Sequence, residues 1–390
     1  MKIFVELSLM VKYIQGDVWM KEISLKDDDF KTLSNLGIDV INQYRKYWFI
    51  RTQGGKYYQD FINENYVGIE WDEISDVELI NRADRDEMKV EVTKNYPEAD
   101  KPGYIVSQIL NFAIEIRKGD IVLIPSENSS WIAFGEVLQD DMYIYEDDDF
   151  QDLLDDFYDD ANSKSSIVKK RRKVKWIKEV KRSNLDPYLY GIIYAHSAIF
   201  NLDKYDLYID RTLSQFYIKG KEAFFTYKVN KKKNIPYFDI LKLLNDNYEI
   251  INFINRKSES LHIDGEQLIL KINVQSKGPI QLKGSIKNVL ILGLVIGLLC
   301  GVKFDFKVPG FEYKVETQGL PALISSVNDV ISKNREDEDM KKITKELKDD
   351  NEKLDLKIPS YNKNSLPKED YKNETDNMNE EKSANNKGSN

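Results

Sequence analysis

The chain of 390 residues has very little cysteine and histidine, and this shortage limits the chemistry it can support. Its single cysteine, Cys300, excludes an intrachain disulfide and any zinc site built from several cysteines. The only histidines are His196 and His262, so a histidine-rich metal centre is excluded too. We therefore expect no bound metal and no other cofactor.

Motifs of the common enzyme classes are also missing. The sequence has no glycine-rich phosphate loop of the Walker type, no nucleophile elbow and no cysteine–histidine pair. Residues 1–6 place an acid inside a short apolar run and lack a small-residue cleavage site, which argues against a signal peptide. We expect a cytoplasmic protein that is not an enzyme.

One arrangement near residue 310 could still support catalysis. Asp305 precedes Glu312 and Lys314 on an expected hairpin. PD-(D/E)xK nucleases use such carboxylates to hold Mg²⁺ and such a lysine to steady the attacking water. Here the preceding proline is missing and the spacing from Asp305 to Glu312 is short. A solvated Glu/Lys pair is the favoured interpretation, and a Mg²⁺-dependent nuclease is the alternative.

The net charge of −9 hides a strong segregation of charge. Residues 140–160 carry only acidic charges, whereas residues 169–182 carry nine basic residues and one acid. Global acidity therefore does not exclude an anionic partner. Strand alternation predicts Arg171, Lys173 and Lys175 on one face of a strand, where they could neutralise phosphates together with Arg172. The alternative is that this strand only offsets the acidic insert at 139–165.

Segments between residues 46 and 182 alternate between strand and helix patterns. Aromatic and β-branched residues bounded by turn residues predict strands at 47–51, 66–71, 118–125, 132–137 and 171–176. Helical spacing of apolar residues predicts helices at 57–63 and 105–117. We expect the basic strand to complete this sheet by pairing with an early strand.

The order of these segments resembles that of the PUA-like/EVE superfamily, and especially the N-terminal modules of Mrr-type restriction proteins. The resemblance covers about residues 46–182 and depends on a first strand ending in Gly54-Gly55, then "KGDIVLIPS", "IAFGEV" and "RRKVKWIKEV". It implies a small β-barrel with helices and a cleft that holds a single base, modified or extruded. The remainder of the chain resembles no family we recognise.

The resemblance also implies a set of ligand-binding residues. Carried over by motif, these are Arg51, Gly54, Gly55, Trp71, Asn111, Pro125, Trp131 and Phe134. By their own chemistry, Trp48, Tyr58, Trp71 and Trp131 can stack on a base, and each can equally serve as core filler. Thr52-Gln53-Gly54-Gly55 replaces the acidic-proline turn of EVE proteins, which puts specificity for modified cytosine in doubt.

The predicted organisation is α+β with several parts. We expect an N-terminal extension at 1–45, the PUA-like module at 46–182, a helical connector at 183–215 and an α+β effector or anchor region at 216–334. Residues 335–390 are expected to be a charged, largely disordered tail, at best a charged helix up to about Leu356. Residues 351–390 contain only Tyr361 and Tyr371 as aromatic side chains.

A glycine-rich apolar helix is expected at 286–302. Its apolar run of 14 residues spans roughly 21 Å, short of the roughly 30 Å hydrocarbon core of a membrane. Gly293, Gly297 and Gly301 form a small-residue face suited to helix packing, either in a membrane or between copies of the chain. The sequence leaves a membrane-seated helix and a buried core helix as alternatives.

These features favour a non-catalytic recognition protein that binds nucleic acid or a nucleotide through the PUA-like module. The resemblance to restriction modules suggests prokaryotic anti-phage defence as the setting. The rival interpretations are the Mg²⁺-dependent nuclease and a membrane-tethered scaffold.

Overall fold

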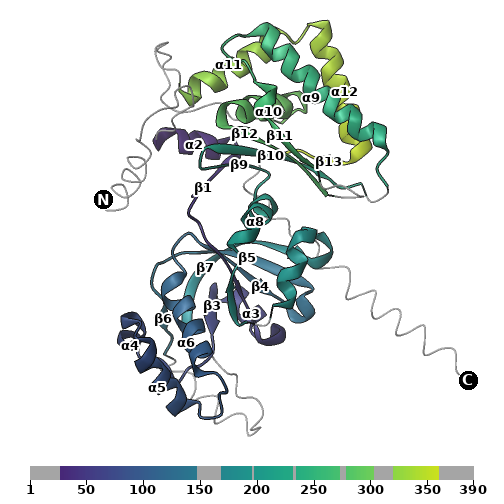
Figure 1. The fold of residues 1–390 in the computed structure, drawn as a ribbon. Helices are drawn as coiled ribbons and strands as arrows, with labels where there is room; N and C mark the ends of the chain where they lie inside the picture. Colours follow the sequence, from purple (N-terminus) through teal and green to yellow (C-terminus); the bar gives the residue numbers. More distant parts are fainter. Residues whose placement is uncertain are drawn as a thin grey trace, which may run out of the picture.

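The computed structural model describes residues 27–146, 168–195, 197–231, 234–272, 278–302 and 319–359. In these residues the chain forms two β-sheets, each in its own lobe with its own helices (Figure 1). The predicted α+β class is confirmed. The candidate nuclease residues Asp305, Glu312 and Lys314 and most of the acidic insert lie outside the described residues.

The first sheet curls into a half-barrel. Its strands follow the order β3-β7-β5-β4-β2-β8, and β6 pairs with β7 beside this path. Strands β2 and β4 are parallel and the other pairs are antiparallel. The strands are β2 (Tyr47–Ile50), β3 (Tyr66–Ile69), β4 (Ile121–Pro125), β5 (Trp131–Val137), β6 (Tyr143–Ile144), β7 (Lys170–Lys181) and β8 (Ile199–Asn201).

Helices cover both faces of this sheet. One core contains Phe61, Ile109 and Phe112 and is covered by α3 (Tyr58–Asn63), α4 (Val77–Arg82), α5 (Arg85–Asn95) and α6 (Pro102–Leu110). Pro102 starts α6, where a missing N–H costs nothing, and Ile105 and Ile109 share its buried face. The other core lies under the 3₁₀ helix η5 (Pro187–Tyr194) and α8 (Asp206–Leu213).

The boundary expected at residue 182 is too early. Strand β7 does pair with the early strand β3, as predicted, but β8 then adds to the opposite edge by pairing with β2. The segment expected to be a helical connector at 183–215 therefore contributes a strand to this sheet. The strand β8 is recognisable only from its pairing with β2, because three residues are too few to show the alternation typical of a strand.

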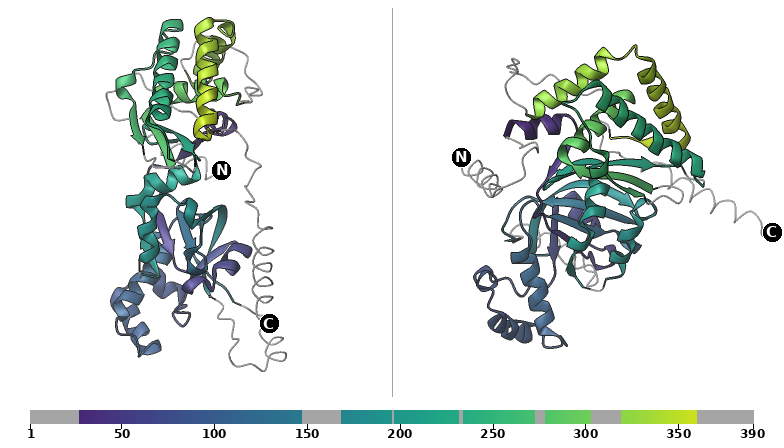
Figure 2. Two further views of the ribbon diagram at one scale, coloured as in Figure 1. Left: turned by 90° about the vertical axis from the view of Figure 1, so that its right-hand side faces the viewer. Right: turned by 45° about the horizontal axis from the view of Figure 1, so that its top comes forward.

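The second sheet has the order β1-β9-β10-β12-β11, with β13 also paired to β10. Its helices lie on the side of the sheet that faces away from the first lobe (Figures 1 and 2). The strands are β1 (Asp39–Ile41), β9 (Phe216–Lys219), β10 (Glu222–Val229), β11 (Ile269–Ile272), β12 (Gly278–Ser285) and β13 (Leu356–Lys357). The helices are α2 (Asp27–Asn35), α9 (Tyr237–Lys257), α10 (Ile286–Leu299), α11 (Leu320–Lys333) and α12 (Glu338–Leu354).

Two segments at the ends of the described chain belong to this second lobe. Strand β1 pairs in parallel with β9, so part of the expected N-terminal extension is an edge of this sheet. Helix α12 lies where the charged helix was expected, before about Leu356, but it buries Met340, Ile343 and Leu347 on one face and packs on α9, so it is part of the folded lobe. Most of the acidic and basic residues of α12 lie on its other face, although Asp350 is buried with the apolar residues. The average composition of the segment does not reveal this apolar face.

A buried polar contact joins the two lobes. The hydroxyl of Tyr47 on β2 donates to Asp210 Oδ1 on α8 at 2.5 Å. Lys219 on β9 of the second sheet donates to Asp206 and Asp210, both at 2.8 Å. Burial raises the pKa of the Asp210 carboxyl, and the neighbouring Lys219 ammonium opposes this shift.

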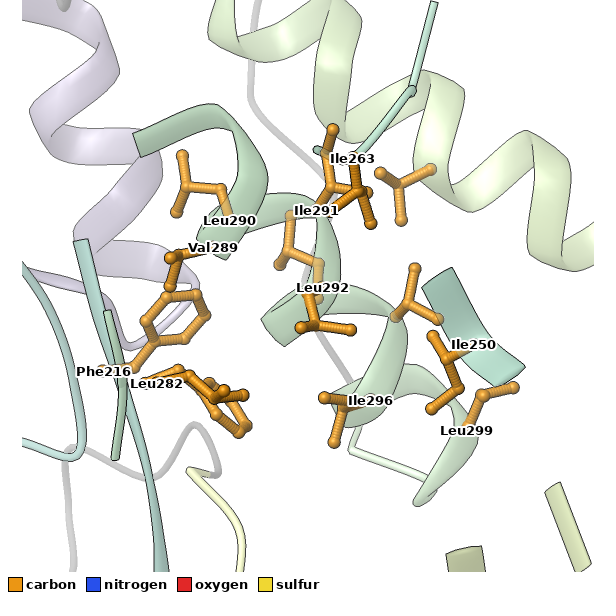
Figure 3. Close-up of a cluster of buried hydrophobic side chains, with 14 of the residues drawn as sticks. Phe216, Ile250, Ile263, Leu282, Val289, Leu290, Ile291, Leu292, Ile296 and Leu299 are labelled. Atoms are coloured by element: carbon orange, nitrogen blue, oxygen red, sulfur yellow. The ribbon is translucent and has the colours of Figure 1, made fainter. Parts of the chain in front are cut away.

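Helix α10 is the glycine-rich helix expected at 286–302, and it lies in the core of the second lobe. Figure 3 shows Val289 next to Phe216, and Ile296 and Leu299 on the side of Ile250 of α9. Among the residues that the structure describes, no helix is long and apolar enough to cross a membrane.

The glycines of α10 serve packing within the chain. A Cβ on Gly293 would lie 2.7 Å from the Phe216 ring and 2.8 Å from the Phe225 ring, so the helix touches the sheet at this point. Gly297 is buried as well, and Gly301 follows the helix with φ of +82°. The expected contact between copies of the chain through Gly293 and Gly297 is therefore wrong, because neither residue is on the surface.

Gly293→Ala should destabilise the second lobe by about 1–3 kcal/mol, because the added methyl group overpacks two buried rings. Urea denaturation followed by circular dichroism measures this loss. Gly103→Ala on α6 is the matched control, since nothing lies within 4 Å of its Cβ position. Equal stability of the two variants would contradict the close packing.

Candidate nucleic-acid interface

The basic strand β7 lies inside the first sheet, between β3 and β5. Its first three residues, Lys170, Arg171 and Arg172, are buried, whereas Lys173 and Lys175 are exposed. Of the residues predicted to bind phosphates, Arg171 and Arg172 are therefore buried, and only Lys173 and Lys175 are exposed. The contacts made by each buried cation show what it does instead.

Arg172 holds the C-terminal end of helix α6. After Leu110 the helix continues as one π-helical turn, η2 (Asn111–Glu115). The Arg172 guanidinium donates to the carbonyl oxygens of Phe112 at 2.6 Å, Ala113 at 2.5 Å, Asp140 at 2.8 Å and Gln139 at 3.3 Å. A positive charge at this position also complements the negative end of the helix dipole. Burial lowers the pKa of Arg172 to about 10, so it stays charged at neutral pH.

Arg171 and Lys170 also have structural partners. The Arg171 guanidinium lies between two rings, 4.0 Å from the centroid of Tyr66 and 3.6 Å from that of Tyr145. Lys170 donates to the Trp71 carbonyl at 2.6 Å, and burial lowers the pKa of its ammonium to about 8. The prediction that Arg171 and Arg172 contact phosphates is wrong, because solvent and ligands do not reach them.

A β-bulge then changes the face on which the remaining basic residues lie. The register between β5 and β7 shifts at Phe134/Gly135, so the strict alternation expected along β7 stops there. Lys175 pairs with Glu136 on the face that bears Phe134, whereas Lys181 pairs with Trp131 on the face that bears Trp176. Lys181 therefore lies on the opposite face of the sheet from Lys173 and Lys175.

Beside Lys181 lies an open groove of about 510 Å³, here called the Lys181 groove. It is formed by the η3 turn (Glu127–Ser129), the end of β7, the η4 turn (Arg182–Asn184) and η5. The residues that line it are Asn128, Ser130, Lys181, Arg182, Ser183 and Tyr190. The residues around this groove thus include two cations, two serines and an asparagine.

Hydrogen bonds fix the position of the groove walls. The Arg182 amide donates to the Ser130 carbonyl at 2.8 Å, and its guanidinium donates to the Tyr194 hydroxyl at 2.9 Å. Asn128 and Ser129 both have left-handed backbones, with φ of 53° and 52°, which makes the turn sharp. Next to this turn the half-buried ring of Trp131 lies 5.9 Å from the Lys181 ammonium.

Three of the predicted ligand residues position this region without lining the groove. Gly55 approaches the backbone of Glu127 so closely that a Cβ would lie at 2.4 Å, and its φ of +106° also requires glycine. Gly54 is left-handed too, with φ of +67°. The hydroxyl of Thr52 donates to the Pro125 carbonyl at 2.6 Å. The glycine turn thus holds the loop after β4.

Other predicted ligand residues have internal partners. Phe134 is fully buried in the core beneath η5. The Arg51 guanidinium donates to the Ile193 carbonyl at 3.1 Å, and Tyr58 donates to Glu179 at 2.7 Å. Trp71 is half-buried at the end of β3, with φ of +65°. Phe134 cannot contact a ligand in this arrangement.

Trp48 and Asn111 lie elsewhere, at a second cavity of about 350 Å³, here called the Trp48 cavity. Only 3% of Trp48 is exposed, and its indole N–H donates to Asp120 at 3.1 Å. Asp120 precedes β4, whereas the Lys181 groove lies beyond its other end. The predicted tryptophans therefore do not converge on one cleft, and the single base-binding cleft expected from the sequence is wrong in this respect.

Sequence reasoning missed Lys181, Arg182, Ser130 and Tyr190 as members of one site. Lys181 and Arg182 were within the basic run, but the bulge that turns Lys181 away from Lys173 depends on pairing with β5. The serines and asparagine after Pro125 are the one local signal, because such a cluster is typical of a tight polar turn.

A comparison with protein families gives a match to part of the chain. A family described as a domain of unknown function (DUF8426) matches residues 46–203. This range begins one residue before β2 and ends shortly after β8, so it coincides with the first sheet and not with the boundary expected at 182. No curated protein and no solved structure matches the chain.

Proposed function

We propose that the domain at residues 46–203 is a recognition module that binds single-stranded nucleic acid without cleaving it, and that the Lys181 groove contacts the strand. The observation that carries this proposal is the pairing of Trp131 with Lys181 beside Arg182 and Ser130. Proteins that bind single strands combine aromatic side chains, on which bases stack, with cations that follow the phosphates.

The chemistry of the groove agrees with this assignment. Arg182 offers the planar fork that suits a phosphate, and Ser183 offers a hydroxyl donor. An unpaired base presents a face that Trp131 can cover, whereas a base inside a duplex does not. The resemblance of the segment order to PUA-like/EVE modules, which hold a single base, supports the same proposal. By analogy with restriction modules, we place the protein in prokaryotic anti-phage defence.

Lys181→Glu combined with Arg182→Glu should reduce affinity for a labelled single-stranded oligonucleotide by at least about tenfold. The slope of log K against log salt should become shallower by about 0.7 for each phosphate that the variant no longer neutralises. Fluorescence anisotropy at several salt concentrations measures both quantities. Trp131→Ala should weaken binding by about 1–3 kcal/mol while leaving the salt slope unchanged, because it removes stacking alone.

The matched control is Lys173→Glu combined with Lys175→Glu. This pair changes the net charge by the same amount, but it lies on the opposite face of the sheet. We expect it to retain most of the affinity. If both double variants bind equally weakly, the groove is not the contact surface, and if both bind as the natural sequence does, the nucleic-acid proposal fails. Tighter binding to a duplex than to a single strand would contradict the role of Trp131.

A further inference from the structure

We propose that the Trp48 cavity is a separate binding site for a small phosphorylated metabolite of about the size of a mononucleotide or a sugar phosphate. This site is distinct from the Lys181 groove, and the inference does not depend on nucleic-acid binding there. Its volume of about 350 Å³ is near the lower end of the roughly 300–1,000 Å³ of small-molecule sites. A monomer fits this space and an oligonucleotide does not.

The cavity lies between four separate parts of the first lobe. Lys46 and Trp48 come from the start of β2, and Asn201 and Asp203 from the end of β8. The remaining walls are the start of α5 and the π-helical turn η2. The residues that line it are Lys46, Trp48, Ala83, Arg85, Leu110, Asn111, Ile114, Glu115, Asn201 and Asp203.

The π-helical turn forms one wall and points to a role beyond packing. Such turns are rare and frequently occur at functional sites. This one places Asn111, Ile114 and Glu115 on the cavity, and Arg172 holds it from behind through the carbonyls of Phe112 and Ala113. The wall is thus fixed in its unusual geometry before any ligand arrives.

Two polar groups on the walls have capacity for a ligand. Within the described part of the chain, the Asn111 side-chain amide makes no hydrogen bond, so its oxygen and its nitrogen are both available. Arg85 uses only Nη1, which donates to the Ser107 hydroxyl at 3.1 Å. Its remaining N–H groups can form the paired hydrogen bonds that a phosphate accepts.

Two carboxylates that line the cavity are suited to the uncharged part of such a ligand. Asp203 accepts from the Tyr47 amide at 2.9 Å and from Asn201 at 2.8 Å, which leaves a lone pair on each carboxylate oxygen. Glu115 pairs with Lys46 through Oε2 at 3.0 Å, so its other carboxylate oxygen can still accept a hydrogen bond. These acceptors suit hydroxyl or amino groups, so a ligand that carries both phosphate and hydroxyls matches the whole cavity better than phosphate alone.

Isothermal titration calorimetry of the full chain tests this site with four probes: adenosine monophosphate, glucose 6-phosphate, adenosine and inorganic phosphate. We expect at least one of the two phosphate esters to bind saturably with one site per chain, and more tightly than adenosine or inorganic phosphate. Arg85→Ala and Asn111→Leu should each weaken this binding by at least about tenfold.

Arg82→Ala is the matched control, because Arg82 is exposed on the neighbouring helix, pairs with Glu87 and does not line the cavity. Lys181→Glu with Arg182→Glu should also leave the metabolite affinity unchanged, so failure of this site and failure of the nucleic-acid proposal give different results. The inference is overturned if neither ester binds at millimolar concentration, or if Arg85→Ala and Asn111→Leu bind as the natural sequence does. Inorganic phosphate that binds as tightly as both esters would likewise overturn it.

Discussion

Arg172→Met is expected to destabilise the first lobe by about 4 kcal/mol. Arg172 is fully buried, and its guanidinium supplies hydrogen bonds to four backbone carbonyls. Each hydrogen bond to a charged group contributes about 1.5–3 kcal/mol, and a buried carbonyl left without a donor costs about 1–3 kcal/mol. Methionine fills a similar volume, so the loss measures the missing donors more than a new cavity.

Tryptophan fluorescence during urea denaturation measures this effect, because Trp48, Trp71, Trp131 and Trp176 all lie in the first lobe. Lys173→Met, at the adjacent exposed position, is the control and should stay within about 0.5 kcal/mol of the natural sequence. Arg172→Lys should fall between the two, since one ammonium keeps the charge but cannot reach four carbonyls. Equal midpoints for Arg172→Met and Lys173→Met would refute the structural role.

The docking of helix α12 on α9 should weaken as the pH rises through about 7. Asp246 on α9 and Asp350 on α12 are both 1% exposed, and Lys242 lies 2.9 Å from Asp350 and 3.6 Å from Asp246. Burial, together with the neighbouring Asp350, raises the pKa of Asp246 to about 7. Below about pH 7, Lys242 thus neutralises the Asp350 carboxylate, and the Asp246 carboxyl keeps its proton.

The sign of this dependence follows from the direction of the shift. Asp246 has a raised pKa in the folded chain, so the folded state binds the proton more tightly than the unfolded state between about pH 4 and pH 7. Stability therefore falls with rising pH in this window, by up to about 1.4 kcal/mol per pH unit. Above it, two ionised carboxylates face one another in the interior. Glu346, whose carbonyl accepts from Lys242, adds a further negative charge on α12.

Hydrogen exchange of the amides in α12, corrected for the intrinsic rates at pH 5, 6, 7 and 8, measures this dependence. Asp246→Asn should remove the slope and protect α12 more than the natural sequence does at pH 8, because the amide imitates the protonated acid. The control is Asp349→Asn. Asp349 is exposed on α12 next to Asp350, and this variant should keep the pH dependence. A slope that survives Asp246→Asn would assign the effect to other groups.

Several elements were predictable because their signals are local. The continuous apolar run within 118–125 predicted a strand, and β4 occupies Ile121–Pro125. The apolar run after Ser285 predicted a helix, and α10 begins where the Ser285 hydroxyl accepts from the Asn288 amide. Its length of 14 residues already favoured a core helix over a membrane span.

The candidate site was predictable only in part. Aromatic residues and a basic run indicated a binding surface within 46–182, and Trp131 lies beside such a groove. The sequence could not tell that Phe134 faces a core or that Trp48 binds Asp120, because burial depends on segments far along the chain. The Arg51 guanidinium, which the resemblance placed among the ligand-binding residues, instead donates to the Ile193 carbonyl, 142 positions away in the sequence.

The sequence by itself determined the α+β class, most strands of the first sheet, the apolar helix and the segregation of charge, since each follows from periodicity or composition within a short window. Tertiary structure alone decided which basic residues are exposed. Arg172 is buried because a π-helical turn 60 positions away presents carbonyls to it, and Lys181 faces the groove because a bulge opposite β5 reverses the alternation of β7. Both outcomes depend on contacts between segments that are far apart in the sequence. Hydrophobic periodicity within a short window does not show which distant segments pair.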